Sequence, residues 1–202
     1  MREHEYETEI DTRLEGKLGF DRVRTFVADR CSTEYAVTRV TEERFSNDPK
    51  VIRERLALTD EMRLIVMFEE NFPTNGYIDC LDFLKPLEKT GYTIDILSLG
   101  KLRTMVETVR KLTNFFMSIK DGVYPNLKRM SAPVLSFPEV QRRIDQILDK
   151  FGDVKDTASD KLLEIRRAIK TKEGAISKRA NAILKQAQAD GLVDEDAGLS
   201  VR

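Results

Sequence analysis

Apolar residues recur at helical spacing along this chain wherever a pattern can be counted. Apolar side chains stand three and four positions apart within residues 20–31, 32–45, 49–72, 81–88 and 98–119, which predicts five amphipathic helices. No stretch alternates apolar and polar residues with the period of two that is typical of a half-buried strand. The sequence therefore predicts an all-α fold with a multi-helical core.

Capping residues indicate where several of these helices begin. Ser32 and Ser98 are expected to cap the second and the fifth helix, because a hydroxyl oxygen can accept from the free N–H groups of the first turn. Asp48, which is followed by Pro49, is expected to cap the third helix, because proline is favoured at the first helical position. Ser136 with Glu139 three residues later forms a capping box, which predicts a further helix from this point.

The most regular pattern belongs to the last expected helix, which starts near Thr157 or Asp160 and ends near Ala189. Its roughly 30 residues would span about 45 Å at 1.5 Å per residue. Large and small apolar residues each recur along it every seven positions: Leu162, Ile169, Ile176 and Ile183, and Ala168, Ala175, Ala182 and Ala189. Such a seam suits close packing against another helix. We expect it to be buried near its start and exposed toward its end, with bending at Gly174.

Charged residues balance over the whole chain but not within the last helix. Lys and Arg number 34 and Asp and Glu 35, so the net charge attracts neither nucleic acid nor a membrane. Between Lys161 and Ala189, however, eight basic residues stand against two acidic ones. Five of them are candidates for contact with a nucleic-acid backbone: Lys170, Lys172, Lys178, Arg179 and Lys185. The alternative is that they only solvate the outer face of a long helix, since no aromatic residues are interleaved for base stacking.

Few residues are available for catalysis or metal binding. The single histidine, His4, and the widely separated Cys31 and Cys80 predict neither a zinc site nor a disulfide framework. The Gly-Lys pairs that begin at Gly16 and Gly100 lack the other residues of a phosphate-binding loop. We therefore expect no catalytic, cofactor-binding or metal-binding residues here. No apolar run is long enough to cross a bilayer and no secretion signal opens the chain, so we expect a cytoplasmic protein without membrane contact.

A run of residues before the last helix resembles a known family. From Gly152 the chain reads G-D-V-K-D-T-A-S-D-K-L-L-E-I-R, which resembles the G-x-[IV]-[RK]-D-x-A-S-x-x-L-x-x-I-R stretch of the MutS-two family, a recombination-suppressing branch of MutS paralogues. The matching residues are Gly152, Asp156, Ala158, Ser159, Leu162, Ile165 and Arg166. Further short stretches agree in order, so that the resemblance covers about residues 18–202.

The resemblance implies an equivalent of the third domain of MutS. Residues 1–152 would form a helical core domain, 153–190 a long projecting lever helix, and 191–202 the start of a clamp segment. Members of the family are dimeric ATPases and endonucleases that bind branched or irregular DNA, suppress recombination and, in some bacteria, act on collided ribosomes. The resemblance implies that the sites for ATP and Mg²⁺, the nuclease domain and the homodimer interface lie in parts of a longer protein outside this chain.

The implied role of this chain is therefore to transmit ATP-driven motion to a DNA clamp, with no active site of its own. Two alternatives remain open. The chain could be a helical interaction scaffold with no link to nucleic acid, or its partner could be ribosomal RNA in place of DNA, because phosphate contacts are common to both.

Overall fold

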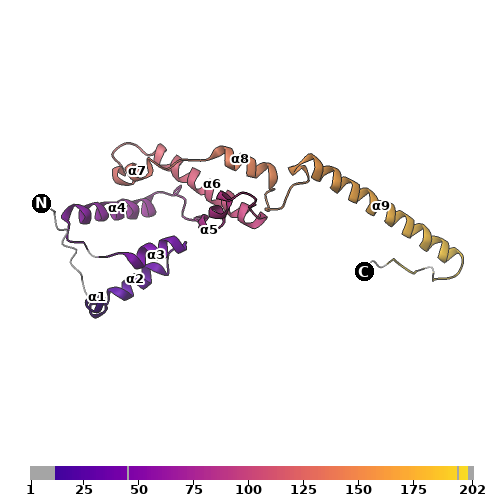
Figure 1. The fold of residues 1–202 in the computed structure, drawn as a ribbon, viewed down its shortest axis with the longest axis horizontal. Coiled ribbons are helices and arrows are strands. Elements are labelled where there is room, and N and C mark those ends of the chain that lie inside the picture. The colour runs from indigo at the N-terminus through magenta and orange to yellow at the C-terminus, as the bar shows by residue number, and fades with distance from the viewer. Residues whose placement is uncertain (1–11, 45, 195, 200–202) are drawn as a thin grey trace. The chain divides into compact units, whose positions relative to one another are not determined.

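Helices are the regular elements of the computed structural model, which describes residues 12–44, 46–194 and 196–199 (Figure 1). The β-type pairing found in these ranges is an isolated antiparallel bridge between Leu148 and Val154. The predicted all-α fold is confirmed. The chain divides into two compact units, Met1–Ile144 and Asp145–Arg202, each of which is described by itself. The predicted domain boundary after Gly152 stays a prediction.

The helices differ widely in length, from a single turn to many turns. Those that begin in the first unit are α1 (Thr12–Leu18), α2 (Phe20–Ala28), α3 (Glu34–Glu42), α4 (Pro49–Phe68), α5 (Leu81–Leu84), the 3-10 helix η1 (Lys85–Glu88), α6 (Ile96–Ser118), α7 (Pro125–Ser131) and α8 (Pro138–Ile147). The second unit contains the 3-10 helix η2 (Asp156–Ala158) and the long helix α9 (Asp160–Ala189).

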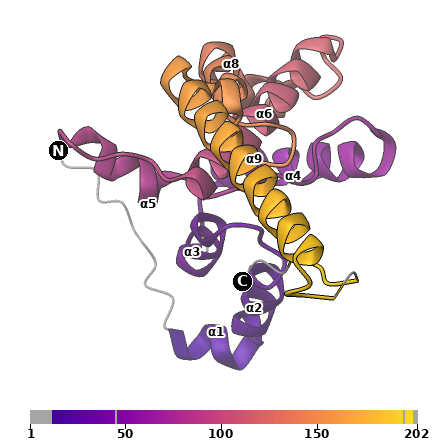
Figure 2. The same ribbon diagram turned by 90° about the vertical axis from the view of Figure 1, so that its right-hand side faces the viewer.

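A part-buried ion pair joins the first three helices, of which α2 packs against both α1 and α3 (Figure 2). The guanidinium of Arg24 donates to both carboxylate oxygens of Glu15, at 2.8 and 2.9 Å. It also donates to the carbonyl oxygen of Glu43, just after α3, at 2.7 Å. A two-pronged pair of this kind is among the stronger charged hydrogen bonds, and here it fixes all three helices through one side chain.

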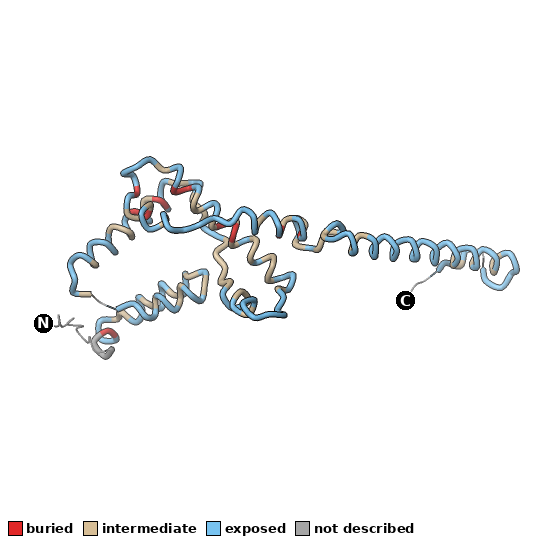
Figure 3. Tube along the Cα trace, turned by 45° about the horizontal axis from the view of Figure 1, so that its top comes forward, coloured by how far each residue is buried: buried red, intermediate tan, exposed pale blue. Residues whose placement is uncertain are grey.

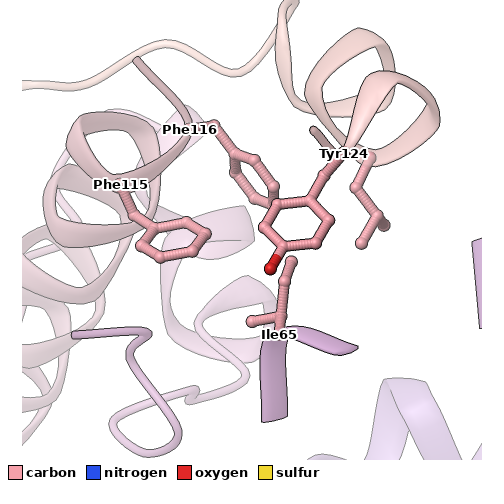
Figure 4. Packing of buried hydrophobic residues seen from close by; sticks show 5 residues of the cluster. Ile65, Phe115, Phe116 and Tyr124 are labelled. Carbon is pink, nitrogen blue, oxygen red and sulfur yellow. The ribbon is translucent and has the colours of Figure 1, made fainter. Parts of the chain in front are cut away.

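The main hydrophobic core lies where α4, α6 and α7 meet, and several of the buried positions in Figure 3 gather there. The rings of Phe115 and Phe116 meet edge to face with their centroids 5.2 Å apart. Figure 4 shows the ring of Tyr124 beside them and Ile65 of α4 pointing toward it. The buried members of this core are Ile65, Phe115, Phe116, Tyr124 and Leu127.

A buried carboxylate of α4 holds the start of α7. Glu61 is 8% exposed, and its carboxylate accepts from the backbone N–H of Asn126 at 3.1 Å, from the Asn126 side-chain amide at 2.7 Å and from the backbone N–H of Leu127 at 2.8 Å. The Tyr124 hydroxyl donates to Glu69, also from the α4 side, at 3.0 Å. Burial and this carboxylate raise the pKa of Tyr124. Free N–H groups at a helix start need such acceptors, which explains why a charge lies beside the core.

Two predicted caps are wrong by a few residues. Thr33, not Ser32, caps α3: its backbone is extended and its hydroxyl oxygen accepts from the N–H of Ala36 at 3.1 Å. Asp95, not Ser98, caps α6, and its carboxylate accepts from the N–H of Ser98 at 2.9 Å. Each predicted residue stands close to a second good cap, and the residue with extended backbone takes the role.

The third helix begins where its pattern predicts and ends earlier. Asp48 caps α4 by accepting from the N–H of Lys50 at 2.7 Å, as predicted. The helix ends at Phe68 and not near Phe72. Outside the helix, the Phe72 ring reaches the core and meets Phe115 edge to face with 5.2 Å between centroids. Packing of one aromatic ring therefore outweighs continuation of the local pattern.

The capping box predicted at the start of α8 is replaced by another arrangement. The helix begins at Pro138, so that Phe137 and not Ser136 precedes it. The Glu139 carboxylate accepts from Arg142 at 2.7 and 3.0 Å and from Arg143 at 3.2 Å. Hydrogen bonds from these guanidinium groups lower the pKa of Glu139 to about 2.

Candidate functional site

The second unit opens with a tight turn that leads into α9. The Asp149 carboxylate accepts from the backbone N–H groups of Phe151 at 2.8 Å and Asp153 at 3.0 Å, and the Asp149 N–H donates to the Asp153 carbonyl at 2.9 Å. Gly152 lies inside the turn with a φ of 91°, a conformation that favours glycine. Desolvation acts to raise the pKa of Asp149, but the backbone hydrogen bonds outweigh it and leave this pKa below its ordinary value.

Arg166 ties the first turns of α9 to the chain that precedes the helix. Its guanidinium donates to the carbonyl oxygen of Val154 at 3.1 Å and to the carboxylate of Asp156. The ammonium group of Lys155 donates to the carbonyl oxygen of Asp145 at 2.6 Å, on the far side of the turn. We call residues 149–166 the α9 anchor, because these bonds fix the direction in which α9 leaves the turn.

Ser159, rather than the predicted Thr157 or Asp160, caps α9. Its backbone is extended and its hydroxyl oxygen accepts from the N–H of Leu162 at 3.2 Å. Ala158 precedes it as the last residue of η2. The motif from Gly152 to Arg166 therefore forms, in order, a turn, an ion pair, a short helix and a helix cap.

Helix α9 is the longest that the structure describes, and it begins within the predicted limits. It continues through Gly174 as one uninterrupted helix. The bend expected at Gly174 stays a prediction. Beyond its last turn, Gly191 has a φ of 68° and donates to the carbonyl of Gln188 at 3.1 Å, while the N–H of Leu192 donates to that of Ala187 at 2.9 Å. This double closure is the Schellman arrangement, which ends the helix near the predicted residue.

Large apolar side chains lie along one face of α9 and are largely uncovered. In Figure 3 most of α9 has the colour of exposed residues. At about 100° per residue they fall within about 60° of the helix circumference. The exposed fraction of the side chains rises along the helix, from 45% for Ile165 and 50% for Ile169 to 68% for Ile176 and 63% for Ile183. Leu162, at the start of the helix, is half-buried, so exposure increases along the helix as expected. Burial of the start of the seam by the core domain stays a prediction. We call this face the apolar strip: Leu162, Ile165, Ile169, Ile176 and Ile183.

The five predicted phosphate contacts are all exposed but do not share one face of α9. Lys178 and Lys185 lie on the face opposite the apolar strip, about 170° around the helix. Lys172 and Arg179 lie beside the strip, about 50° from its centre, and are called the inner pair. Lys170 lies about 70° from Lys178 and Lys185, on the side of the helix away from the inner pair. The prediction grouped these five residues because all are basic, whereas their positions around the helix axis place them on different faces of α9.

Arg167 is a basic residue that the prediction left out. It stands 11 residues before Lys178, which is close to three full turns, so both lie on the same face of α9 as Lys185. All three side chains are exposed, and none forms an ion pair with a residue within the described ranges. We call Arg167, Lys178 and Lys185 the outer row. The spacing of 11 and seven residues was the signal in the sequence that could have found it.

No family model matches the chain. The curated endonuclease MutS2 of Listeria innocua is 25% identical to it over 195 residues, which are 96% of this chain and 25% of the relative. The endonuclease MutS2 of Geobacillus sp. (strain WCH70) gives the same identity and coverage, and that of Geobacillus thermodenitrificans is 24% identical over 187 residues, or 92% of this chain. The chain is similar to endonuclease MutS2 proteins. It spans about a quarter of the length of these curated relatives.

The resemblance read from the motif at the α9 anchor is thereby confirmed, because the MutS2 proteins match almost the whole of this chain and not the motif alone. Their similarity covers the helices of the first unit, the α9 anchor and α9 itself. It leaves about three quarters of each MutS2 relative without a counterpart in this chain.

The structure also places the other residues that the sequence singled out. Gly16 lies within α1 and Gly100 within α6, so neither Gly-Lys pair sits in the loop that a phosphate site needs, and these residues do not fit a bound nucleotide. Among the described residues, no three metal-ligating side chains gather in one place. No described helix is long and apolar enough to cross a membrane. The last residues expected to enter a clamp, 200–202, lie outside the described residues.

Proposed function

We propose that this chain is the helical core and lever region of a protein that resembles endonuclease MutS2. In this role α9 carries a displacement between the part of the whole protein that hydrolyses ATP and the part that encloses DNA. The observation that supports it is that the motif shared with the MutS-two family forms the α9 anchor. A helix whose first turns are fixed by Ser159 and Arg166 transmits a rotation of its base along its whole length.

The length and regularity of α9 suit this task. Its 30 residues extend for about 45 Å, and both ends are closed by defined caps. A straight helix changes little in length under load, because each residue is held by its own i to i−4 hydrogen bond. Motion applied at the α9 anchor therefore arrives at Ala189 with little loss.

The apolar strip indicates that α9 does not act alone. Its isoleucines are about half to two thirds exposed, and covering them would contribute roughly 1 kcal/mol each at about 25 cal/mol per Å². We assign the strip to a returning helix of the lever, supplied by the remainder of the whole protein.

The substrate of the whole protein is proposed to be branched or irregular DNA, in keeping with the word endonuclease in the names of the relatives. ATP, Mg²⁺, nuclease activity and a homodimer interface are assigned to the remainder of that protein. Ribosomal RNA, the alternative partner, and a scaffold without nucleic acid are treated as outcomes of the experiments below.

A chimaeric protein tests the lever. This chain replaces the matching quarter of the Listeria innocua endonuclease MutS2, and the affinity of the chimaera for a DNA junction is measured with and without ATP. In the parent chimaera we expect ATP to change this affinity. The double variant Ile169→Asn/Ile176→Asn should abolish the change, because the second helix loses its apolar partner.

The matched control is Thr171→Asn/Ala182→Asn, which places the same side chains on the opposite face of α9 and should leave the ATP effect intact. Circular dichroism of the isolated chain checks that both variants keep their helix content. Retention of the full ATP effect by the Ile169→Asn/Ile176→Asn chimaera would contradict the lever assignment.

A further inference from the structure

The lever role uses the apolar strip and leaves the opposite face of α9 without an assigned task. The outer row on that face spans about 27 Å, from Arg167 through Lys178 to Lys185, at 1.5 Å per residue. This length corresponds to about eight base pairs of duplex at 3.4 Å each. The three side chains are exposed and make no ion pair within the described part of the chain, so their charges are available to a ligand.

The surroundings of the outer row allow an anion to approach. The side chains between its members on this face are small, and Gly174, Ala175 and Ala182 are all exposed. Between Lys161 and Ala189 the sequence holds two acidic residues, Glu164 and Glu173. Glu164 lies three residues before Arg167, at the start of the outer row and near the same face. Glu173 is the acidic residue between Arg167 and Lys185. It lies about 120° or more around the helix from the outer row, where it cannot repel a phosphate approaching this face.

The position of the outer row also separates it from the packing of the lever. A helix that covers the apolar strip would bring its edges close to the inner pair, Lys172 and Arg179, whose long stems can lie along an apolar surface. The outer row stays free of such a helix because it points in the opposite direction. One side of α9 can therefore pack against protein while the other contacts a second ligand.

We propose that the outer row binds the phosphodiester backbone of a nucleic-acid duplex laid along α9. The proposal rests on the proposed function, because it takes its ligand class from a nucleic-acid enzyme. A straight row of cations with no aromatic residue on the same helix fits backbone contact with a stiff duplex and not the stacking platforms that hold single strands. The contact carries no sequence preference and positions the duplex against the lever.

The experiment uses the 202-residue chain with two fluorescently labelled probes, a DNA duplex and an RNA duplex of the same sequence. Binding is measured by anisotropy over a range of salt concentrations. The outer variant Lys178→Glu/Lys185→Glu is compared with the inner variant Lys172→Glu/Arg179→Glu. Both change the charge equally, and both pairs are seven residues apart.

We expect the outer variant to lower the affinity by about tenfold or more and to reduce the slope of log affinity against log salt by about 2, since each lost phosphate contact removes about 0.9. The inner variant should change the affinity by less than about threefold. Weaker binding of the outer variant to either duplex that the parent chain binds supports the proposed site. The duplex that the parent chain binds identifies the ligand as DNA, RNA or both.

Equal losses in the two variants would overturn the proposal, because net charge and not the outer row would then govern binding. Failure of the parent chain to bind either duplex would overturn it as well. The lever is judged separately by the isoleucine variants in the chimaera. If the outer variant binds duplexes as well as the parent while the isoleucine variants lose the ATP effect, the lever proposal is supported and the outer row is not. If the outer variant loses binding while the isoleucine variants keep the ATP effect, the outer row is supported and the lever is not.

Discussion

Removal of the Glu61 carboxylate gives the sharpest test of how the first unit is held together. In Glu61→Ala, the backbone N–H groups of Asn126 and Leu127 and the Asn126 amide lose their acceptor at 2.7 to 3.1 Å. The residue is 8% exposed, so water has little access to replace it. The start of α7 should then separate from α4 beside the main core.

The size of the effect follows from the bonds that are lost. Hydrogen bonds to a charged group contribute about 1.5–3 kcal/mol, and a buried donor left without a partner costs about 1–3 kcal/mol. Because the three bonds share one carboxylate and part of α7 can relax into water, we expect Glu61→Ala to lower the free energy of unfolding by about 2–4 kcal/mol. Glu61→Gln should fall in between, since its amide keeps one acceptor oxygen.

Urea titration followed by near-ultraviolet circular dichroism measures this, because Tyr124 and two phenylalanines lie in the affected core. The matched control is Glu54→Ala, which removes an exposed ion pair with Arg129 at 3.2 Å between the same two helices. That change should cost less than about 1 kcal/mol. Equal stability losses in the Glu61 and Glu54 variants would refute the assignment of Glu61 as the acceptor that holds α7.

Three further outcomes follow from the structure. Gly76→Ala should lower the free energy of unfolding by about 2 kcal/mol or more, because Gly76 has a φ of 82° and a Cβ there would collide with the Thr108 hydroxyl. A melting temperature of this variant equal to that of the parent chain would disprove the prediction. The hydrogen bonds from Arg24 hold the pKa of Glu15 below its ordinary value, so this pair stabilises the fold above about pH 4.5 and its contribution disappears as the pH falls through the lower, folded-state pKa. The stability difference between the parent and Arg24→Ala should therefore shrink in acid, and a difference that stays constant with pH would contradict the pairing. In the isolated chain, hydrogen exchange should be slower in the α9 anchor than in the last turns of α9, and uniformly strong protection along α9 would show that the apolar strip is already covered.

Local patterns predicted many of the helices because the apolar residues of an amphipathic helix recur every three to four positions in the sequence. Asp48 with its proline marked the start of α4 correctly, since cap and helix are neighbours in sequence. Where two cap residues stood close together, as at Ser32 and Thr33, the backbone conformation decided, and the sequence does not display it. The Glu61 contact joins positions 65 residues apart and leaves no mark in any local pattern.

The candidate site was found in part, for similar reasons. The motif from Gly152 to Arg166 pointed to the right place, but the turn, the ion pair with Asp156 and the cap became visible only in the structure. The basic residues of α9 were recognised from the composition of the segment, which does not show toward which side of the helix each side chain points. Their division into an outer row and an inner pair follows from the helical angle of each position.

The lever assignment depends most directly on whether a second helix covers the apolar strip in the whole protein. Single cysteines at Ile176→Cys and Lys178→Cys, in a background where Cys31 and Cys80 are replaced by serine, report on opposite faces of the same turn of α9. Their labelling rates with a maleimide are compared between the isolated chain and the Listeria chimaera. In the isolated chain both should react quickly, because both positions are exposed. In the chimaera the lever proposal expects slow labelling at position 176 and unchanged labelling at position 178, whereas equally fast labelling at both positions would contradict it.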